Sequence, residues 1–171
     1  DEILVGYHYF YGFYFKELFW KSRFLKLLKE VYFYLKIHKS LYGVKSLFYF
    51  MLPDFIKTNY RTDKASFLIK NFSDKYKNNN NVTKNIYASK NLNDALIDHI
   101  NHKLEHLLKW EDRNSMYFSL ESRVPFLDYR LVEGTIASLS SFKIKNGVTK
   151  YILRESMIGI LPNKIRNRVD K

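Results

Sequence analysis

The chain has 171 residues, which is enough for one ordinary domain and too few for two full enzyme domains. Hydrophobic residues make up 46% and charged residues 27%, as in packed globular proteins, and the sequence has no cysteine, which excludes disulfides and thiolate chemistry within it. The 29 Lys and Arg residues exceed the 17 Asp and Glu residues and give a net charge of +12, which would attract the phosphates of a nucleotide, a nucleic acid or a membrane surface.

The composition also predicts a mainly helical fold. There are 14 Tyr and 14 Phe but only 6 Gly and 3 Pro, and so few turn-forming residues favour long helices over many short strands. Charged residues interrupt each apolar run before it reaches the roughly 18 to 20 residues that a membrane-spanning helix needs. The lack of cysteine fits a reducing cytoplasm, and we expect a cytoplasmic protein. The chain starts without Met, and we expect it to be a piece of a longer protein.

The first half of the chain is predicted to be helical and aromatic. Apolar residues recur at three-and-four spacing over 15–35 with lysines between them, which predicts a long basic amphipathic helix or a helix pair broken near Ser22. A second apolar stretch, 47–52, should end at Pro53. Segment 71–93 turns polar and Asn-rich, and we expect a solvated loop or insertion there.

The second half begins with an apolar stripe at helical spacing from Leu96 to Trp110, which predicts another helix. Pro125 predicts extended backbone before Asp128, whose side chain can cap a following helix. The residues expected to face inward on that helix are Leu131, Val132, Ile136 and Leu139.

The end of the sequence predicts a turn and a last helix. Asn146-Gly147 is a typical turn pair, and Thr149 is the expected N-cap of the helix, which Pro162 should end. Its expected inward residues are Leu153, Met157, Ile160 and Leu161.

Lys150 occupies an unusual position at the start of this last predicted helix, on the side of its apolar residues. An ammonium suits neither an apolar stripe nor the positive end of a helix dipole, so a nearby anion would explain it, and phosphate is a common ligand of helix N-termini. Arg154, one turn later, would reinforce the same field. The alternative is a lysine that extends its ammonium into water.

Acidic residues offer two further candidate features. Asp1 and Glu2 precede a glycine-containing turn, and a carboxylate there is a suitable oxygen ligand for a hard cation such as Mg²⁺. Further along, acidic and basic residues alternate in a way that predicts either an ordered network at a site or ordinary salt bridges. These residues are Asp112, Arg113, Glu121, Arg123, Asp128 and Arg130.

Two patterns suggest other functions. His99, His102 and His106 have the spacing of ligands on one side of a helix, although no further ligand pattern supports zinc. The rings and lysines of 7–39 would suit a basic helical RNA-binding or scaffolding module, but rings at helical spacing are more often core. The sequence contains no glycine-rich phosphate loop, so the main cradle of any bound nucleotide lies elsewhere.

Several motifs follow one another in the last third of the chain. They are Glu111-Asp112-Arg113-Asn114-Ser115-Met116, Leu120-Glu121-Ser122-Arg123-Val124-Pro125-Phe126-Leu127-Asp128, Thr149-Lys150-Tyr151-Ile152-Leu153-Arg154-Glu155 and Ile160-Leu161-Pro162. In this order and spacing they resemble the C-terminal part of the synthetase domain of the glutamine-hydrolysing asparagine synthetases. The opening 1–7 is similar to the end of that family's glycine-rich acidic turn, with Val5 where a glycine is common, whereas 14–104 matches only in character.

The resemblance implies a mainly α fold, the helical C-terminal portion of an α/β synthetase domain of the adenine-nucleotide alpha-hydrolase-like type, also called the PP-loop ATP pyrophosphatase type. Residues 1–171 would be a partial domain that lacks the PP-loop and the N-terminal glutaminase domain, and would be inactive alone. The implied enzyme is an ATP-dependent ligase of asparagine biosynthesis. It activates aspartate as an aspartyl adenylate, and ammonia from glutamine then gives asparagine.

The resemblance also implies roles for particular residues. Asp1 would hold the Mg²⁺ that bridges the phosphates of ATP, with Glu2 and Arg154 beside the nucleotide, and Lys150 would stabilise the charge that develops on the α-phosphate and pyrophosphate. The residues expected to form the wall behind the site are Glu121, Arg123 and Asp128. The expected partners are aspartate, ATP and glutamine-derived ammonia, without nucleic acid or membrane, and a homodimer is allowed.

Overall fold

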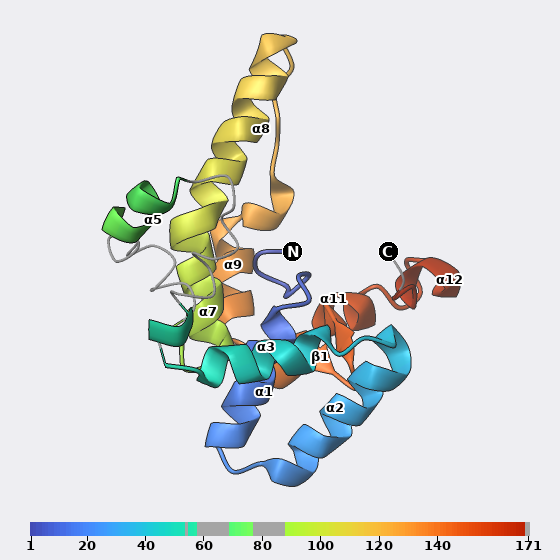
Figure 1. The fold of residues 1–171 in the computed structure, drawn as a ribbon. Helices are drawn as coiled ribbons and strands as arrows, with labels where there is room; N and C mark the ends of the chain where they lie inside the picture. The colour runs from blue at the N-terminus through green and yellow to red at the C-terminus, as the bar shows by residue number, and fades with distance from the viewer. Residues whose placement is uncertain (54, 58–68, 77–87, 170–171) are drawn as a thin grey trace.

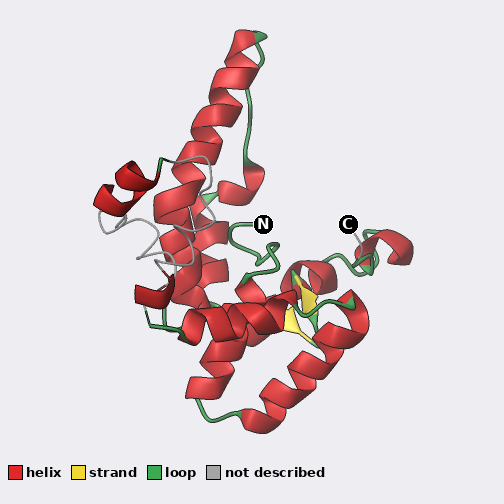
Figure 2. Ribbon diagram, in the orientation of Figure 1, coloured by secondary structure: helices red, strands yellow, loops and turns green. Residues whose placement is uncertain are grey.

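The computed structural model describes residues 1–53, 55–57, 69–76 and 88–169, and most of these are helical (Figures 1 and 2). The α-helices are α1 (Phe10–Trp20), α2 (Phe24–His38), α3 (Tyr42–Met51), α5 (Lys70–Tyr76), α7 (Leu92–His99), α8 (Glu105–Tyr117), α9 (Tyr129–Ala137), α10 (Ser140–Lys143), α11 (Tyr151–Ser156) and α12 (Asn163–Arg166). The other elements are the π-helix η1 (Ile100–Leu104), the 3₁₀ helix η2 (Pro125–Leu127) and the strands β1 (Ile144–Lys145) and β2 (Val148–Thr149).

Helix α1 lies at the centre of the fold. Every residue from Phe10 to Leu18 is buried, because α2, α3 and α7 pack around the helix. Helix α3 approaches especially closely at Gly12, where a Cβ atom would lie only 2.6 Å from the Ser46 Cβ. Beside this contact the rings of Phe13 and Phe50 stack with centroids 4.1 Å apart. The aromatic residues of α1 from Phe10 to Phe15 therefore form the core together with Tyr34 and Phe50.

The predictions for the first half are largely confirmed. The expected helix pair is present, because α1 ends at Trp20 and α2 begins at Phe24, with Ser22 between them at a positive φ of 54°. Helix α3 ends at Met51, two residues before Pro53. In the polar segment 71–93, α5 covers the start and α7 the end, while its centre, 77–87, lies outside the described residues.

Helices α7, η1 and α8 follow one another without a break, and α8 extends away from the rest of the molecule (Figure 1). The predicted stripe is buried at its start, where Leu96 is fully covered, but not at its end, where Trp110 is 61% exposed. The π-helix explains part of the difference: its wider turn rotates all later side chains relative to an ideal α-helix. The stripe prediction is thus wrong for α8, where no residue is buried.

The helix that follows Pro125 is confirmed together with its cap. The Asp128 carboxylate accepts a hydrogen bond from the Arg130 amide (3.0 Å), which satisfies a free N–H in the first turn of α9. The expected inward residues are only partly correct, because Leu131 and Leu139 are exposed and the residue that α9 buries is Thr135.

The predicted turn at Asn146-Gly147 joins two short antiparallel strands, with Ile144 opposite Thr149. Both turn residues have positive φ, 50° and 70°, which is the backbone that makes Asn-Gly a favoured hairpin turn. The expected N-cap is wrong: Thr149 ends β2, and Lys150 occupies the cap position of α11.

The last helix is also shorter than predicted. Helix α11 ends at Ser156, and the backbone then turns at Gly159, which has a positive φ of 77°. Leu153 and Met157 are half-buried, but the expectation that Ile160 and Leu161 face inward is wrong, since both are exposed. None of the helices in the described part of the chain has the length and apolar character needed to cross a bilayer.

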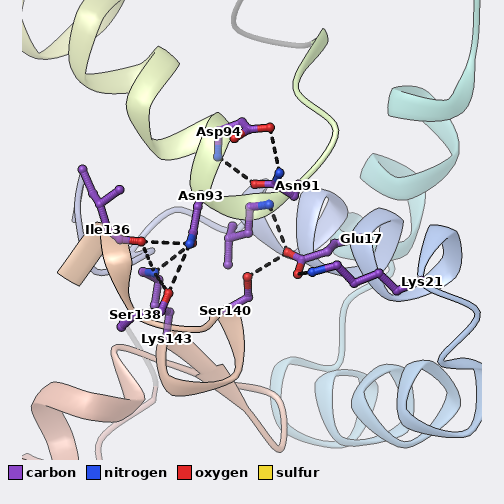
Figure 3. A network of polar contacts seen from close by, with 10 residues as sticks. Glu17, Lys21, Asn91, Asn93, Asp94, Ile136, Ser138, Ser140 and Lys143 are labelled. Atoms are coloured by element: carbon purple, nitrogen blue, oxygen red, sulfur yellow. Dashed lines mark hydrogen bonds and ion pairs between the residues drawn. The ribbon is translucent and has the colours of Figure 1, made fainter. Parts of the chain in front are cut away.

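A buried polar network connects α1 to α7 and to the C-terminal segment around α10 (Figure 3). The Glu17 carboxylate accepts hydrogen bonds from the Ser140 hydroxyl (2.7 Å) and the Leu92 amide (3.2 Å), and pairs with Lys21 (2.6 Å). The fully buried Lys143 ammonium donates to Asn93 and to carbonyl oxygens at the C-terminal end of α9, those of Ile136 and Ser138. Burial lowers the pKa of Lys143 to about 8, against the attraction of the Glu17 carboxylate, so this network contains opposite charges inside the fold.

Candidate functional site

A small cavity of about 170 Å³ lies where the N-terminal turn meets the C-terminal hairpin and α11. Its ionisable lining is predominantly basic and consists of His8, His38, Lys150, Arg154 and Arg168, with Asp1 as the acidic member. Such an excess of cationic groups favours an anionic ligand. The volume is below the roughly 300 Å³ at which typical small-molecule pockets begin, so the cavity suits a phosphate chain better than a whole nucleotide.

Two of the predicted site residues meet in this cavity, although they are far apart in the sequence. The Lys150 ammonium forms an ion pair with the Asp1 carboxylate, and each side chain keeps about a third of its surface exposed (35% and 39%). Lys150 has the left-handed φ of 55°. A carboxylate thus lies beside this lysine, and a phosphate ligand stays a prediction.

The N-terminal turn has the backbone that places Asp1 in the cavity. The Gly6 amide donates to the Asp1 carbonyl (2.9 Å), and the Asp1 side chain occupies the space that a Cβ on Gly6 would need. Val5 is fully buried and has a φ of 61°, a left-handed conformation that a β-branched residue rarely adopts. Glycine adopts such a backbone without steric cost, which explains why the family resemblance predicts a glycine at position 5.

Glu2 is held differently from Asp1. Its carboxylate accepts a hydrogen bond from the Tyr7 hydroxyl (2.7 Å), and it is absent from the cavity lining. Burial acts to raise the pKa of Glu2, but the hydrogen bond from Tyr7 helps to hold the net value below the ordinary one. The same bond raises the pKa of Tyr7 to about 12. Glu2 thus contributes to the shape of the turn.

Arg154 lines the cavity and also holds the backbone around it. Its guanidinium donates to the carbonyl oxygens of Thr149 (3.0 Å) and Arg166. Burial lowers the pKa of Arg154, which still leaves the group cationic at neutral pH. The residue therefore adds positive charge and joins the end of β2 to α12.

The three residues predicted to form a wall lie outside this cavity lining. Glu121 forms an exposed ion pair with Arg123 (2.8 Å), and Asp128 forms another with Arg130 (2.8 Å). The sequence left a site network or ordinary salt bridges open, and the pairs seen are ordinary surface salt bridges. A role of these residues in a larger site stays a prediction.

The histidine pattern does not form a metal centre. No group of three or more potential metal ligands occurs in the residues that the structure describes. His99 is 1% exposed and its Nδ1 lies 2.8 Å from the Tyr9 hydroxyl, whereas His106 is exposed on α8. Burial, and secondarily the charge of Lys103, lowers the pKa of His99 to about 4.

His99 should make the stability of the fold sensitive to acid. The unfolded chain binds a proton at this residue below pH 6.5, but the folded chain only near pH 4, so its contribution is complete above pH 6.5 and is lost as the pH falls to 4. We expect a loss of about 2–3 kcal/mol over this range. Thermal unfolding of the complete protein at stepped pH should show a shallower pH slope for His99→Gln, and an unchanged slope for His106→Gln. An identical slope for His99→Gln and the unsubstituted protein would contradict this expectation.

Several residues of the cavity were not found from the sequence. Tyr11 lies near its base and donates a hydrogen bond to the Gly147 carbonyl (2.7 Å), and His8 and His38 pack with ring centroids 4.9 Å apart. Tyr11 is in α1, His38 ends α2, and His8 lies in the turn before α1, a part of the sequence where only core spacing was visible. Arg168 and Val169 also line the cavity and were missed, because their short terminal segment carries no pattern that marks them.

The burial of the rings does not favour the ring-and-lysine alternative. It predicted that the aromatic and basic residues of 7–39 would be exposed together. The rings from Phe10 to Phe15 are instead buried in the core, while Trp20 at the end of α1 and Phe24 and Tyr32 on α2 remain exposed.

Comparison with known proteins identifies the family. A helical fold with a cationic cavity is consistent with a phosphate-binding protein, and the model of the asparagine synthase family matches residues 1–171. The chain belongs to this family. The mainly helical fold that the resemblance implied is therefore confirmed for this chain. The α/β core with its nucleotide loop stays a prediction.

Two curated relatives from Bacillus subtilis (strain 168) match parts of the chain. Asparagine synthetase [glutamine-hydrolyzing] 1 is 44% identical over 57 residues, which cover 33% of this chain and 9% of that protein. Asparagine synthetase [glutamine-hydrolyzing] 3 is 45% identical over 65 residues, or 38% of this chain and 11% of that protein. The aligned parts thus amount to about a tenth of the relatives' length. No solved structure shows a significant match.

Proposed function

We propose that this chain is part of an ATP-dependent ligase that converts aspartate to asparagine through an aspartyl adenylate, with ammonia from glutamine. The observation that carries the proposal is the Asp1–Lys150 ion pair in a cationic cavity, within a chain that matches the asparagine synthase family over its whole length. The names of the two relatives support the same substrate and ammonia source. In this proposal residues 1–171 supply part of the site and are inactive alone.

The lining of the cavity fits the charge that the reaction develops. Attack of the aspartate carboxylate on the α-phosphate forms the adenylate and releases pyrophosphate, so negative charge accumulates on phosphate oxygens. A fixed ammonium aimed at those oxygens stabilises the charge more than it stabilises the starting state. Lys150 takes this role, with Arg154 and Arg168 beside it. Since the cavity suits only the phosphate chain, the adenosine moiety binds to residues elsewhere.

Asp1 fits a magnesium ion that accompanies ATP. Mg²⁺ binds oxygen ligands, keeps several waters and commonly needs only one or two carboxylates in addition to the substrate phosphates. Asp1 offers one such carboxylate at the cavity, and Lys150 already balances its charge. The ion would neutralise phosphate charge when bound. Asp1 would hold the ion, and Lys150 would supply a cation for the phosphates.

The products formed by the complete protein test the proposal. With ATP and aspartate we expect aspartate-dependent release of pyrophosphate, and when glutamine or ammonia is added we expect AMP, pyrophosphate and asparagine in equal amounts. Formation of ADP and phosphate would instead indicate an acyl phosphate and would refute the adenylate route. Absence of any aspartate-dependent turnover, with activity on another carboxylic acid, would refute the substrate assignment. A labelled RNA oligonucleotide in the same preparation tests the RNA-binding alternative, which the family match does not favour.

A further inference from the structure

Glu30 on α2 is a buried carboxylate that the proposed reaction does not use. It is 3% exposed and does not line the cationic cavity. Its two oxygens accept hydrogen bonds from two consecutive backbone amides, those of Asn146 (3.1 Å) and Gly147 (3.0 Å). A buried carboxylate with both oxygens directed at one turn is a specific arrangement, because burial of an unpaired charge is strongly unfavourable.

The turn that Glu30 binds is fixed from other sides as well. The Gly147 carbonyl accepts the Tyr11 hydroxyl (2.7 Å), and His38 Nε2 lies 3.0 Å from the same oxygen. The Cα atom of Gly147 packs directly against α2, because a Cβ on this residue would lie 2.6 Å from the backbone of Phe33 and Tyr34. The hairpin tip is therefore held by α1 and α2, through hydrogen bonds to both its amides and its carbonyl.

The seated turn leads directly to Lys150. Only Val148 and Thr149 separate Gly147 from Lys150, and both belong to β2, which pairs with β1. The left-handed backbone of Lys150 follows at once, and Arg154 holds the Thr149 carbonyl from the other side. Both residues of this strand pair with β1, and Glu30 and Arg154 hold its two ends. A displacement of the turn would therefore displace the Lys150 ammonium relative to Asp1.

We infer that Glu30 is a positioning residue for Lys150, which acts through its paired hydrogen bonds to the turn of the β1–β2 hairpin. The inference rests on the proposed function, since it assumes that the Lys150 ammonium stabilises the phosphates. It assigns a role to α2, which lies in the part of the sequence where the family resemblance carried no motif. Electrostatic stabilisation depends on the accurate placement of the charge, so loosening the turn should lower kcat more than it weakens substrate binding.

The test uses Glu30→Gln in the complete protein. The carboxamide keeps one acceptor oxygen but places an N–H group opposite one backbone amide, so one of the two hydrogen bonds is lost. We expect kcat for aspartate-dependent pyrophosphate release to fall about 10-fold, with KM for aspartate within about twofold of the unsubstituted value. Glu133→Gln, at an exposed glutamate on α9, is the matched control and should leave both constants unchanged.

A double-substitution cycle with Lys150→Met separates positioning from general destabilisation. If Glu30 acts through Lys150, Glu30→Gln should lower kcat by no more than about twofold once Lys150 is methionine. The inference would be overturned if Glu30→Gln lowered kcat equally in the unsubstituted protein and in Lys150→Met, or if it did not lower kcat in the unsubstituted protein. Hydrogen exchange of the Asn146 and Gly147 amides should accelerate in Glu30→Gln while α1 exchanges as before, and unaltered exchange of the two amides would also overturn it.

Two outcomes would distinguish a failure of the proposed function from a failure of the role assigned to Glu30. If Lys150→Met alone leaves pyrophosphate release unchanged, the assigned site is wrong, and the role of Glu30 falls with it. If Lys150→Met is impaired and Glu30→Gln is not, only the role of Glu30 falls. Should Glu30→Gln fail to fold, Glu30→Asp, which keeps the charge but shortens the reach, takes its place in the same cycle with the same expected losses.

Discussion

Replacement of Lys150 by methionine should lower aspartate-dependent pyrophosphate release by the complete protein by about 10²–10³-fold. Methionine keeps most of the length and apolar character of the side chain but removes the charge that faces Asp1 in the cavity. The expected loss corresponds to about 3–4 kcal/mol in the activation free energy. Radiolabelled pyrophosphate release under saturating ATP and aspartate measures it, since rates this low remain detectable with the label.

Lys145→Met is the matched control, because Lys145 lies on the same hairpin but is exposed. Its ammonium lies over the Tyr151 ring, 4.6 Å from the centroid, and it is absent from the cavity lining. We expect pyrophosphate release within about twofold of the unsubstituted protein. If both substitutions cause the same loss, the effect of Lys150→Met would reflect hairpin structure or net charge, and unchanged release in Lys150→Met would remove this lysine from the reaction.

Replacement of Glu17 by alanine should produce the largest loss of stability, about 3–5 kcal/mol, because it breaks a buried charged network. The Ser140 hydroxyl and the Leu92 amide lose their acceptor, and the buried Lys143 ammonium loses an attractive carboxylate (Figure 3). Thermal unfolding of the complete protein should show a lower midpoint. Hydrogen exchange should accelerate at the start of α7 and around α10, where the network is anchored.

Lys21→Met tests whether the surface ion pair of Glu17 explains that loss. The Lys21 side chain is 55% exposed, and exposed pairs contribute about 0–1 kcal/mol. We therefore expect a reduction in the unfolding free energy of less than about 1 kcal/mol for Lys21→Met. A reduction as large as that of Glu17→Ala would show that the exposed pair, and not the buried hydrogen bonds, supplies the stabilisation.

Features set by neighbouring residues could be predicted from the sequence. The break at Ser22, the Asp128 cap and the Asn146-Gly147 turn all depend on local backbone preferences, and each is found in the structure. Thr149 shows the limit of such signals. A threonine is a good N-cap, but here Thr149 pairs with Ile144 as the last residue of β2. Lys150 is therefore the N-cap residue of α11.

Features that depend on distant contacts could not be predicted in the same way. The meeting of Asp1 with Lys150 joins the two ends of the chain, and only the family resemblance indicated that both belong to one site. The cavity residues His8 and His38 follow core spacing, because they come from the same aromatic segments that form the interior. The π-helix η1 has no clear sequence signature either, and a periodicity that assumes uniform α-helical turns places the later side chains wrongly.

The arm formed by α8 affects how this protein can be handled. Trp110, Met116 and Tyr117 are each at least 59% exposed, and the segment after the helix adds Phe118 and Leu120. Uncovered aromatic and aliphatic groups in such number promote self-association in water. A preparation of residues 1–171 alone should thus self-associate, and its light scattering should rise with concentration. Kinetic and calorimetric measurements should therefore use the complete protein.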